Sequence, residues 1–353
     1  MSEVSPLAAQ SKERGFPPIS RRAWFLIAAV IIAVLPLVVK DSYWRTNLIV
    51  CALNVQLAIG LDFVVGYAGQ LNLGQSAFYG LGAYGSTLLV LKLGLPFWTA
   101  FAIGTLMAGV AGALLSFFAV RLRGHYLAIA SLGFAVIIYQ ILLNWISMTQ
   151  GPLGIYGIAP PPVVALPGLP QIVFSDLRNL FYLTAGFTLI VYILLDQMVR
   201  SPIGETLTAI REDEVSAASL GIDAAKWKAF AFAVSSAAAG AAGCFYAPFV
   251  GTLVPDAFFV TESFMILAMV IVGGMGTLVG PVFGAILLTV LPEFLRSIGD
   301  LREYVPRHRD VVLSQHPLGR ATLCIQNLAR MGDRKRRRSR RSASPRHLLA
   351  LNA

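Results

Sequence analysis

Charged residues are scarce in this chain. Asp, Glu, Lys and Arg make up 13% of its 353 residues, whereas hydrophobic residues make up 56% and the mean hydropathy is +0.70. Soluble domains carry about 25% charged residues, so this chain has too little polar surface to dissolve as a globular domain. The composition excludes a water-soluble fold and indicates an integral membrane protein.

Residues and motifs that usually carry chemistry are equally few. The three cysteines, Cys51, Cys244 and Cys324, are widely spaced and suggest neither a disulfide framework nor a metal site. Of the four histidines, only His125 lies in the apolar part of the chain. The sequence contains no G-x-x-x-x-G-K-S/T phosphate-binding loop, no HExxH motif and no GxSxG motif. These absences argue against an enzyme, and we expect no cofactor and no metal.

Long apolar runs dominate what is present. A membrane-spanning helix needs about 20 predominantly apolar residues. Runs bounded by charges, proline and glycine predict helices at 23–39, 46–65, 76–92, 96–120, 126–147, 180–199, 229–250 and 262–298. The last run is long enough to form two elements, broken between Gly273 and Pro281. We therefore expect an all-α fold, a polytopic membrane helical bundle of about 8–9 transmembrane helices with Gly-rich broken segments.

The positive charges predict how this bundle is oriented. Cytoplasmic loops of membrane proteins carry an excess of Lys and Arg. Here these residues cluster in the tail 1–22, at Arg121 and Arg123, and across the segment 200–228. The predicted helices place all three sites on one side of the membrane. We therefore expect a cytoplasmic N-terminus and a cytoplasmic 200–228 segment, while the proline-rich loop 148–179 faces outward.

A glycine-rich stretch interrupts an apolar run at membrane depth. Five glycines lie between Gly66 and Tyr84, together with several amide and hydroxyl side chains. Backbone without regular structure is tolerated at that depth only where protein or a water-filled cavity surrounds it. One interpretation is a broken helix that lines a translocation path, and the alternative is close helix packing through small residues. The candidate path residues are Gly69, Gln70, Asn72, Gly74, Gln75 and Ser76.

Two further features lie within the predicted helices. A carboxylate at the bilayer centre costs on the order of 2.5–3.5 kcal/mol, so Asp62 should face protein or water. A position near the cytoplasmic interface is favoured for it over a proton-coupling role. A second glycine cluster, between Gly273 and Ala285, repeats the order Gly, Leu, Gly, Phe, Gly-Ala of the first. The echo hints at an internal repeat, although helix packing explains the individual glycines.

The segment 200–228 holds the largest concentration of charge before the C-terminal tail. Pro202 followed by acidic and small residues predicts short amphipathic helices outside the bilayer. Such a segment is usually a solvated loop. The small residues from Ala217 to Gly221 would also let another protein approach closely, so a docking role is the second interpretation.

These motifs, taken in order, resemble the permease subunits of branched-chain amino acid ABC importers, the LivM-like branch, across roughly residues 25–304. The runs that carry the resemblance are Gly66-Tyr-Ala-Gly69-Gln70-Leu-Asn72-Leu-Gly74, Arg121 to Ile129, Thr149 to Ile155, Ser201 to Glu214, and Leu220-Gly221. One small departure is Gln150, where the family commonly has Gly.

The resemblance implies a multi-pass subunit of the bacterial inner membrane that carries branched-chain or related amino acids. It implies pairing with a second homologous permease subunit, docking of two ATP-binding cassette subunits, and delivery of solute by a periplasmic solute-binding protein. ATP would be hydrolysed by the partners, in line with the missing phosphate-binding loop. Residues implied in coupling to the ATPase are Gly204, Glu212, Asp213, Ala217, Ala218 and Gly221.

A rival function from another class is a stand-alone secondary transporter or channel for a small polar solute such as urea or an amide. It would also need broken helices and a polar path, but not a docking segment. Carboxylates able to couple protons are few in the predicted helices, and most lie near helix ends. The sequence therefore favours the importer subunit.

The C-terminal tail departs from the family. We expect a transmembrane domain over 23–300, whereas residues 301–353 become polar and include the basic run 334–341. The resemblance implies a further apolar helix there. The tail is interpreted either as an appendage that binds nucleic acid or anionic lipid, or as disordered or aberrant sequence left by a frame error. The abrupt change favours the frame error, so no nucleic-acid partner is expected.

Overall fold

The computed structural model describes residues 30, 32–39, 41–119, 125–161, 174 and 176–294. Two units divide the chain, Met1–Val290 and Leu291–Ala353, and of the second only residues 291–294 are described. The expected cytoplasmic tail 1–22 and the basic tail 301–353 lie outside the described residues. The fold below is that of the first unit.

The described residues are mainly helical, as predicted. The principal helices are α2 (Ser42–Asp62), α3 (Gln75–Leu93), α4 (Phe97–Ala119), α5 (His125–Asn144), α7 (Leu177–Val199), α10 (Ala224–Val250), α11 (Val260–Gly273) and an unlabelled helix Val279–Phe294. Residues 32–38 are also helical, within the first predicted helix. Of the helices in the described part of the chain, 6 are long and apolar enough to cross a membrane. The polytopic helical class is therefore confirmed, whereas this number does not reach the expected count.

Several helices begin earlier than their apolar runs because an aspartate caps the first turn. Asp41, Asp176 and Asp223 precede α2, α7 and α10, and each side chain accepts a hydrogen bond from a backbone N–H of its helix. The first N–H groups of a helix have no partner within the helix, and an N-cap carboxylate supplies one. These caps extend each helix by three to five residues into polar sequence that hydropathy alone assigns to loops.

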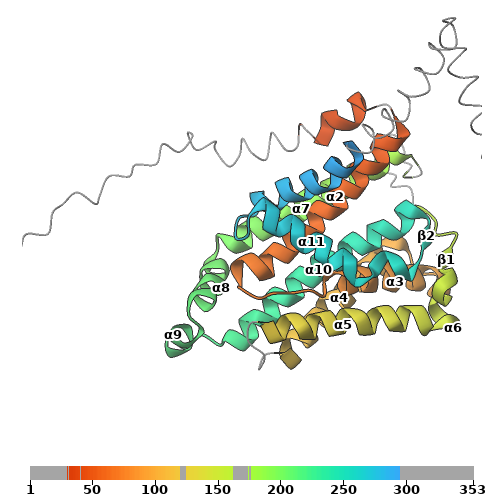
Figure 1. Cartoon of the computed structure of the whole chain (residues 1–353). Helices are drawn as coiled ribbons and strands as arrows, with labels where there is room; N and C mark the ends of the chain where they lie inside the picture. The colour runs from red at the N-terminus through yellow and green to blue at the C-terminus, as the bar shows by residue number, and fades with distance from the viewer. Residues whose placement is uncertain are drawn as a thin grey trace, which may run out of the picture. The chain divides into compact units, whose positions relative to one another are not determined.

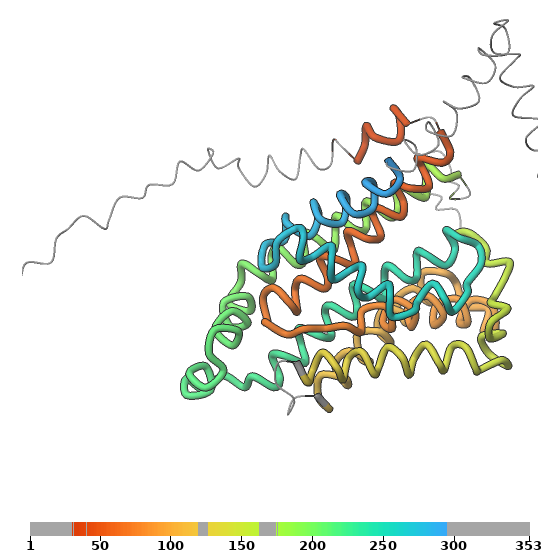
Figure 2. The backbone as a smooth tube through the Cα atoms, viewed as in Figure 1, coloured from red at the N-terminus to blue at the C-terminus, as the bar shows by residue number. Residues whose placement is uncertain are grey.

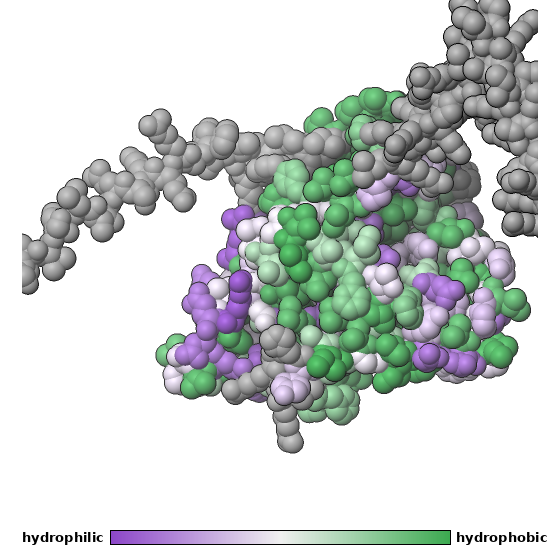
Figure 3. Space-filling view, in the orientation of Figure 1, coloured by the Kyte–Doolittle hydropathy of each residue, from purple (hydrophilic) through white to green (hydrophobic). Residues whose placement is uncertain are grey.

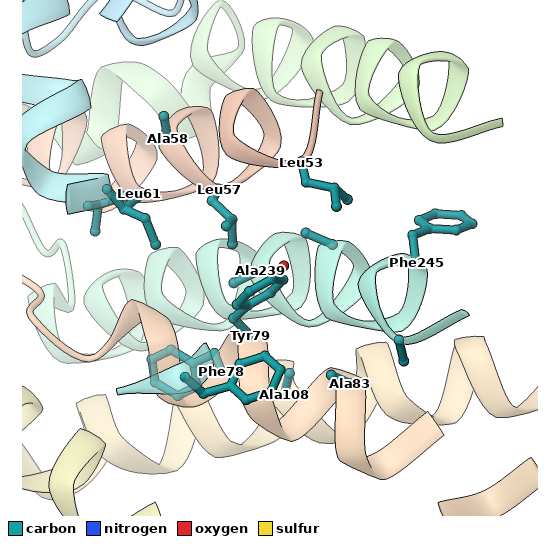
Figure 4. Close-up of a cluster of buried hydrophobic side chains, with 14 of the residues drawn as sticks. Leu53, Leu57, Ala58, Leu61, Phe78, Tyr79, Ala83, Ala108, Ala239 and Phe245 are labelled. Carbon is teal, nitrogen blue, oxygen red and sulfur yellow. The ribbon is translucent and has the colours of Figure 1, made fainter. Parts of the chain in front are cut away.

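Helix α10 lies between two groups of helices (Figures 1 and 2). It packs against α3 and α4 on one side and against α2 on the other, and α2 in turn packs against α7 and α11. Leucines of α2 meet Ala239 of α10 and Tyr79 of α3 in the core (Figure 4). Small residues allow close approach, since a Cβ added to Gly82 of α3 would lie 2.1 Å from the Gly240 carbonyl oxygen of α10.

The end of the bundle opposite α8 and α9 departs from an all-α fold in one detail. Helix α5 stops at Asn144, and α6 (Ile146–Thr149) and the 3-10 turn η2 (Gly151–Leu153) follow. Strand β1 (Ile155–Tyr156) then pairs antiparallel with β2 (Thr252–Leu253), which leads into the 3-10 turn η3 (Pro255–Phe258). The predicted helix 126–147 is thus too long by three residues. The all-α prediction misses this short ladder because its strands are two residues each.

The surface has both apolar and hydrophilic regions (Figure 3). Large apolar side chains are exposed along α4 and α5, among them Leu106, Phe117, Phe118 and Ile137. Hydrophilic residues gather over α8 (Pro202–Glu212) and α9 (Glu214–Ser219). Exposed apolar area of this extent fits a surface that contacts lipid or other membrane helices.

Candidate translocation path and coupling segment

The glycine-rich stretch contains a break between two helices, while its role as the wall of a translocation path stays a prediction. Helix α2 ends at Asp62, a single π-helical turn η1 (Phe63–Tyr67) follows, and the backbone has no regular structure up to the start of α3 at Gln75. A π turn interrupts the regular pattern of helical hydrogen bonds and is frequent at functional sites. We call residues 63–76, which include the first two residues of α3, the α2–α3 break.

Two amides of the break bind protein rather than open space. Asn72 accepts a hydrogen bond from the Gly74 N–H (2.8 Å) and donates one to Gln75 Oε1 (3.1 Å). Gln75 donates to the Leu57 carbonyl of α2 (3.4 Å) and accepts from Ser235 of α10 (3.4 Å). Both amide side chains are fully buried. Through Gln75 they connect the break to α2 and α10.

Serine hydroxyl groups form further hydrogen bonds with the break. The Ser76 N–H donates to Ser263 Oγ of α11 (2.9 Å), and Ser263 Oγ donates to Ser76 Oγ (2.8 Å). The Leu73 N–H donates to Ser131 Oγ of α5 (2.9 Å). Gln70 and Gly74 are also buried, so of the predicted path residues only Gly69 lies at the surface of the isolated subunit. The six residues lie close together along the chain, and Gln75 and Ser76 among them bind neighbouring helices.

The second glycine cluster forms a second break. Helix α11 ends at Gly273 and the next helix begins at Val279. The Gly276 N–H, between them, donates to Asp62 Oδ1 (2.9 Å). The predicted interruption between Gly273 and Pro281 is confirmed, and the two glycine clusters that echo each other in sequence meet at Asp62. This carboxylate is fully buried and faces protein, as its cost in lipid requires.

The segment 200–228 contains the two short helices that its sequence predicts. Ser201 caps α8 by accepting from the Ile203 N–H, and Pro202 occupies the first position of the helix. Asp213 caps α9, accepting from the Val215 N–H (2.9 Å) and Ser216 Oγ (2.6 Å). These hydrogen bonds, the one from Ser216 first, lower the pKa of Asp213 below its ordinary value because they stabilise the ionised carboxylate.

A left-handed residue ends α9. Gly221 has φ +82°, its N–H donates to the Ala218 carbonyl (3.0 Å), and the Ile222 N–H donates to the Ala217 carbonyl (3.2 Å). This pair of hydrogen bonds is a Schellman motif, whose left-handed position favours glycine. Apart from Gly221 and its two chain neighbours, no residue that the structure describes has a heavy atom within 4 Å of the place where a Cβ would stand on Gly221. The turn is therefore open on the side where a partner could approach.

The candidate coupling residues divide into two sets. Gly204 is buried against the end of α7, and Ala217 is buried within the segment 200–228. The exposed set is Glu212, Asp213, Ala218 and Gly221.

Two large apolar side chains of α9 and its end, Val215 at 68% exposure and Leu220 at 80%, lie near the exposed set. Sequence reasoning passed over them, although apolar residues within a charged segment were a usable signal.

Two basic residues connect this segment to the membrane helices. Lys228 of α10 forms an ion pair with Glu214 of α9 (2.9 Å), with the lysine side chain only 10% exposed. Arg211, in the last turn of α8, donates from Nη1 to the carbonyl oxygen of Gly66 in the α2–α3 break. Neither residue was singled out from the sequence, because the partner of Arg211 lies 145 positions away.

Taken together, the fold and the site define a polytopic helical membrane protein with two adjacent helix breaks and a pair of short helices, α8 and α9, that contacts one of them. The family model described as branched-chain amino acid transport system / permease component matches residues 45–313. The chain belongs to this family.

Curated relatives carry the same description in their names. The chain is 37% identical over 301 residues to the high-affinity branched-chain amino acid transport system permease protein LivM of Escherichia coli (strain K12), covering 79% of this chain and 69% of that protein. It is 38% identical over 265 residues to the protein of that name from Salmonella typhimurium (strain LT2), covering 70% and 62%.

A more distant match is the probable branched-chain amino acid transport permease protein LivM of Methanocaldococcus jannaschii, 23% identical over 246 residues, with 69% and 66% covered. The chain thus spans about two thirds of the length of these relatives. No solved structure matches it.

Proposed function

We propose that this chain is a permease subunit of an ATP-binding-cassette importer that translocates branched-chain or related amino acids across the bacterial inner membrane. Family membership supports the substrate class. The observation that carries the mechanism is the α8–α9 pair, which follows transmembrane helix α7, leads into α10 and presents exposed apolar residues. A self-sufficient transporter or channel has no need of such a surface.

The partners follow from this role. The proposal includes a second homologous permease subunit, two ATP-binding cassette subunits that hydrolyse the ATP, and a periplasmic solute-binding protein, with no nucleic acid. The ATP-binding subunits dock on the exposed set of the α8–α9 pair and on Val215 and Leu220. A few residues that are buried in well-packed pockets near the centre of an interface supply most of its affinity.

The translocation path borders the α2–α3 break. In this proposal Gly69 and Gln70 stand at the path, while Asn72, Gly74, Gln75 and Ser76 fix the shape of its wall. Backbone without regular structure is tolerated in a membrane where it lines a cavity, and path sites in other transporters lie at broken helices. The second permease subunit would close the path on the exposed side.

The topology completes the proposal. Three further helices would also cross the membrane in this proposal: α3, which has 19 residues, the first predicted helix, and Val279–Phe294. Together with the 6 candidate spans they would reach the expected number of transmembrane helices. The N-terminus and the α8–α9 pair lie in the cytoplasm and the permease domain extends over 23–300. Labelling of single cysteines introduced at Ser216 and at Leu153 tests this, because only the former should react from the cytoplasmic side.

Reconstitution tests the function itself. The complete importer in liposomes should accumulate radiolabelled leucine only when ATP is present on the side of the ATP-binding subunits. The chain alone should give no uptake. ATP-independent uptake by this chain alone would refute the proposal and favour the secondary transporter.

A further inference from the structure

One polar side chain of α8, that of Arg211, binds the backbone of the α2–α3 break. Arg211 Nη1 donates to the Gly66 carbonyl, which belongs to the π-helical turn. The stem of the same side chain lies against Gly69, where an added Cβ would stand 2.7 Å from Arg211 Cγ. Gly69 has φ +67°, so a side chain there would meet both backbone strain and this contact. The break is shaped to receive Arg211.

The guanidinium group also lies beside the second break. A Cβ added to Gly276 would stand 3.2 Å from Arg211 Nη1. Gly276 is the residue whose N–H binds Asp62 Oδ1. One arginine of the extramembrane segment therefore touches both places where the membrane helices are interrupted.

Asp62 provides a second acceptor close by. Its carboxylate is attracted electrostatically to Arg211, and its Oδ2 atom is buried with no hydrogen-bond partner among the residues that the structure describes. A buried carboxylate oxygen without a partner is costly, and a guanidinium group can satisfy it from a planar fork of donors. Arg211 has donors to spare for it, since its Nη1 alone binds Gly66.

The position of Arg211 near the end of α8 would let movement of the exposed residues reach the α2–α3 break. Glu212 and Asp213, the next two residues, are exposed in the set proposed to dock the ATP-binding subunits. At its other end α8 packs against α7, with Gly204 close to the Val199 carbonyl. A displacement of α9 and the end of α8 by a partner would therefore move Arg211 relative to the break.

We propose that Arg211 is a positioning residue that transmits movement of the α8–α9 pair to the α2–α3 break, holding the Gly66 carbonyl in the present state and engaging the free oxygen of Asp62 when α8 shifts. This inference rests on the proposed function. Arg211 touches neither solute nor nucleotide, and it acts through the backbone at Gly66 and the carboxylate at Asp62.

The ratio of leucine transported to ATP hydrolysed, measured on the complete importer in liposomes, tests the inference. Arg211→Ala should lower that ratio about tenfold while basal ATP hydrolysis is retained, because it removes a charge-assisted hydrogen bond between the two parts. Arg211→Gln keeps a donor for Gly66 but no charge for Asp62, and should give an intermediate ratio. Asp62→Asn should also lower the ratio.

A double variant shows whether Arg211 and Asp62 act together or contribute independently to the transport ratio. If Arg211 and Asp62 act together, Arg211→Ala combined with Asp62→Asn should be no worse than the more damaging single change. Lys226→Ala is the matched control, because Lys226 is a charged residue of the same segment whose exposed ion pair with Asp223 reaches neither break. It should keep the wild-type ratio.

Three results would overturn the inference: a wild-type ratio in Arg211→Ala, equal loss of transport and ATP hydrolysis, or additive effects in the double variant. Should Arg211→Ala not assemble, Arg211→Gln supplies the same comparison. Failure of the proposed function is a different result, because the wild-type importer itself would then transport without ATP.

Discussion

The α2–α3 break and the α8–α9 pair are both irregular parts of a helical protein, but they differ in how far the chain satisfies them. Polar backbone and side-chain groups of the break form hydrogen bonds with α2, α5, α10 and α11. In the α8–α9 pair, large apolar residues and an open turn face outward. The buried polar groups of the first region bind within the subunit, whereas the second region leaves large apolar side chains exposed.

The largest expected effect tests whether the hydrogen bonds of the α2–α3 break stabilise the isolated subunit. Gln75→Leu removes the bonds to Leu57 and Asn72 and leaves the buried Ser235 hydroxyl without this acceptor. Unsatisfied buried polar groups cost about 1–3 kcal/mol each, so the melting temperature of the purified protein should fall by several degrees. Leu71→Ala is the control, because Leu71 is exposed at the same break. Equal melting temperatures for both variants would contradict the comparison.

The next prediction separates two effects of replacing Gly221 at the end of α9: backbone strain and an added side chain on the surface. Gly221→Ala places a Cβ at φ +82°, a left-handed conformation that costs about 1–2 kcal/mol for ordinary residues. Gly221→Asn is better tolerated there, because asparagine visits this region more readily. Thermal unfolding should therefore distinguish Ala from Asn.

Uptake by the complete importer should be lowered by both Gly221 substitutions, because each adds a side chain at the proposed docking surface. A larger residue such as Trp should abolish it while the chain still inserts. Normal uptake in the Gly221→Trp variant would show that no partner approaches this turn.

A smaller effect is expected from the apolar residues beside that turn. Leu220→Ser removes an 80% exposed side chain and should leave thermal stability unchanged, whereas binding of the ATP-binding subunits should weaken about tenfold if Leu220 is an anchor. Leu153→Ser is the matched control, with 75% exposure in η2. Binding measured by light-scattering detection of the complex should respond to Leu220 alone.

The same contrast explains which parts of the molecule could be predicted from sequence. Apolar runs and glycine clusters predict the helices and both breaks, because hydropathy and backbone freedom are local properties. The direction in which Asn72 and Gln75 face is not local, since an amide can bind solute or backbone equally well. The contact between Arg211 and Gly66 depends on how α8 folds back onto η1, which no pattern within either segment encodes.

The smallest effect concerns the charge of the cap between α8 and α9. Because its hydrogen bonds lower the pKa of Asp213 in the folded state, the ionised cap stabilises α9 above the ordinary value of 3.8, and this contribution is lost as the pH falls through the lowered pKa. Asp213→Asn keeps a capping oxygen without the charge. Wild type should melt slightly higher than this variant at pH 7, and the difference should vanish in acid. A difference that persists at low pH would assign the stabilisation to the shape of the cap alone.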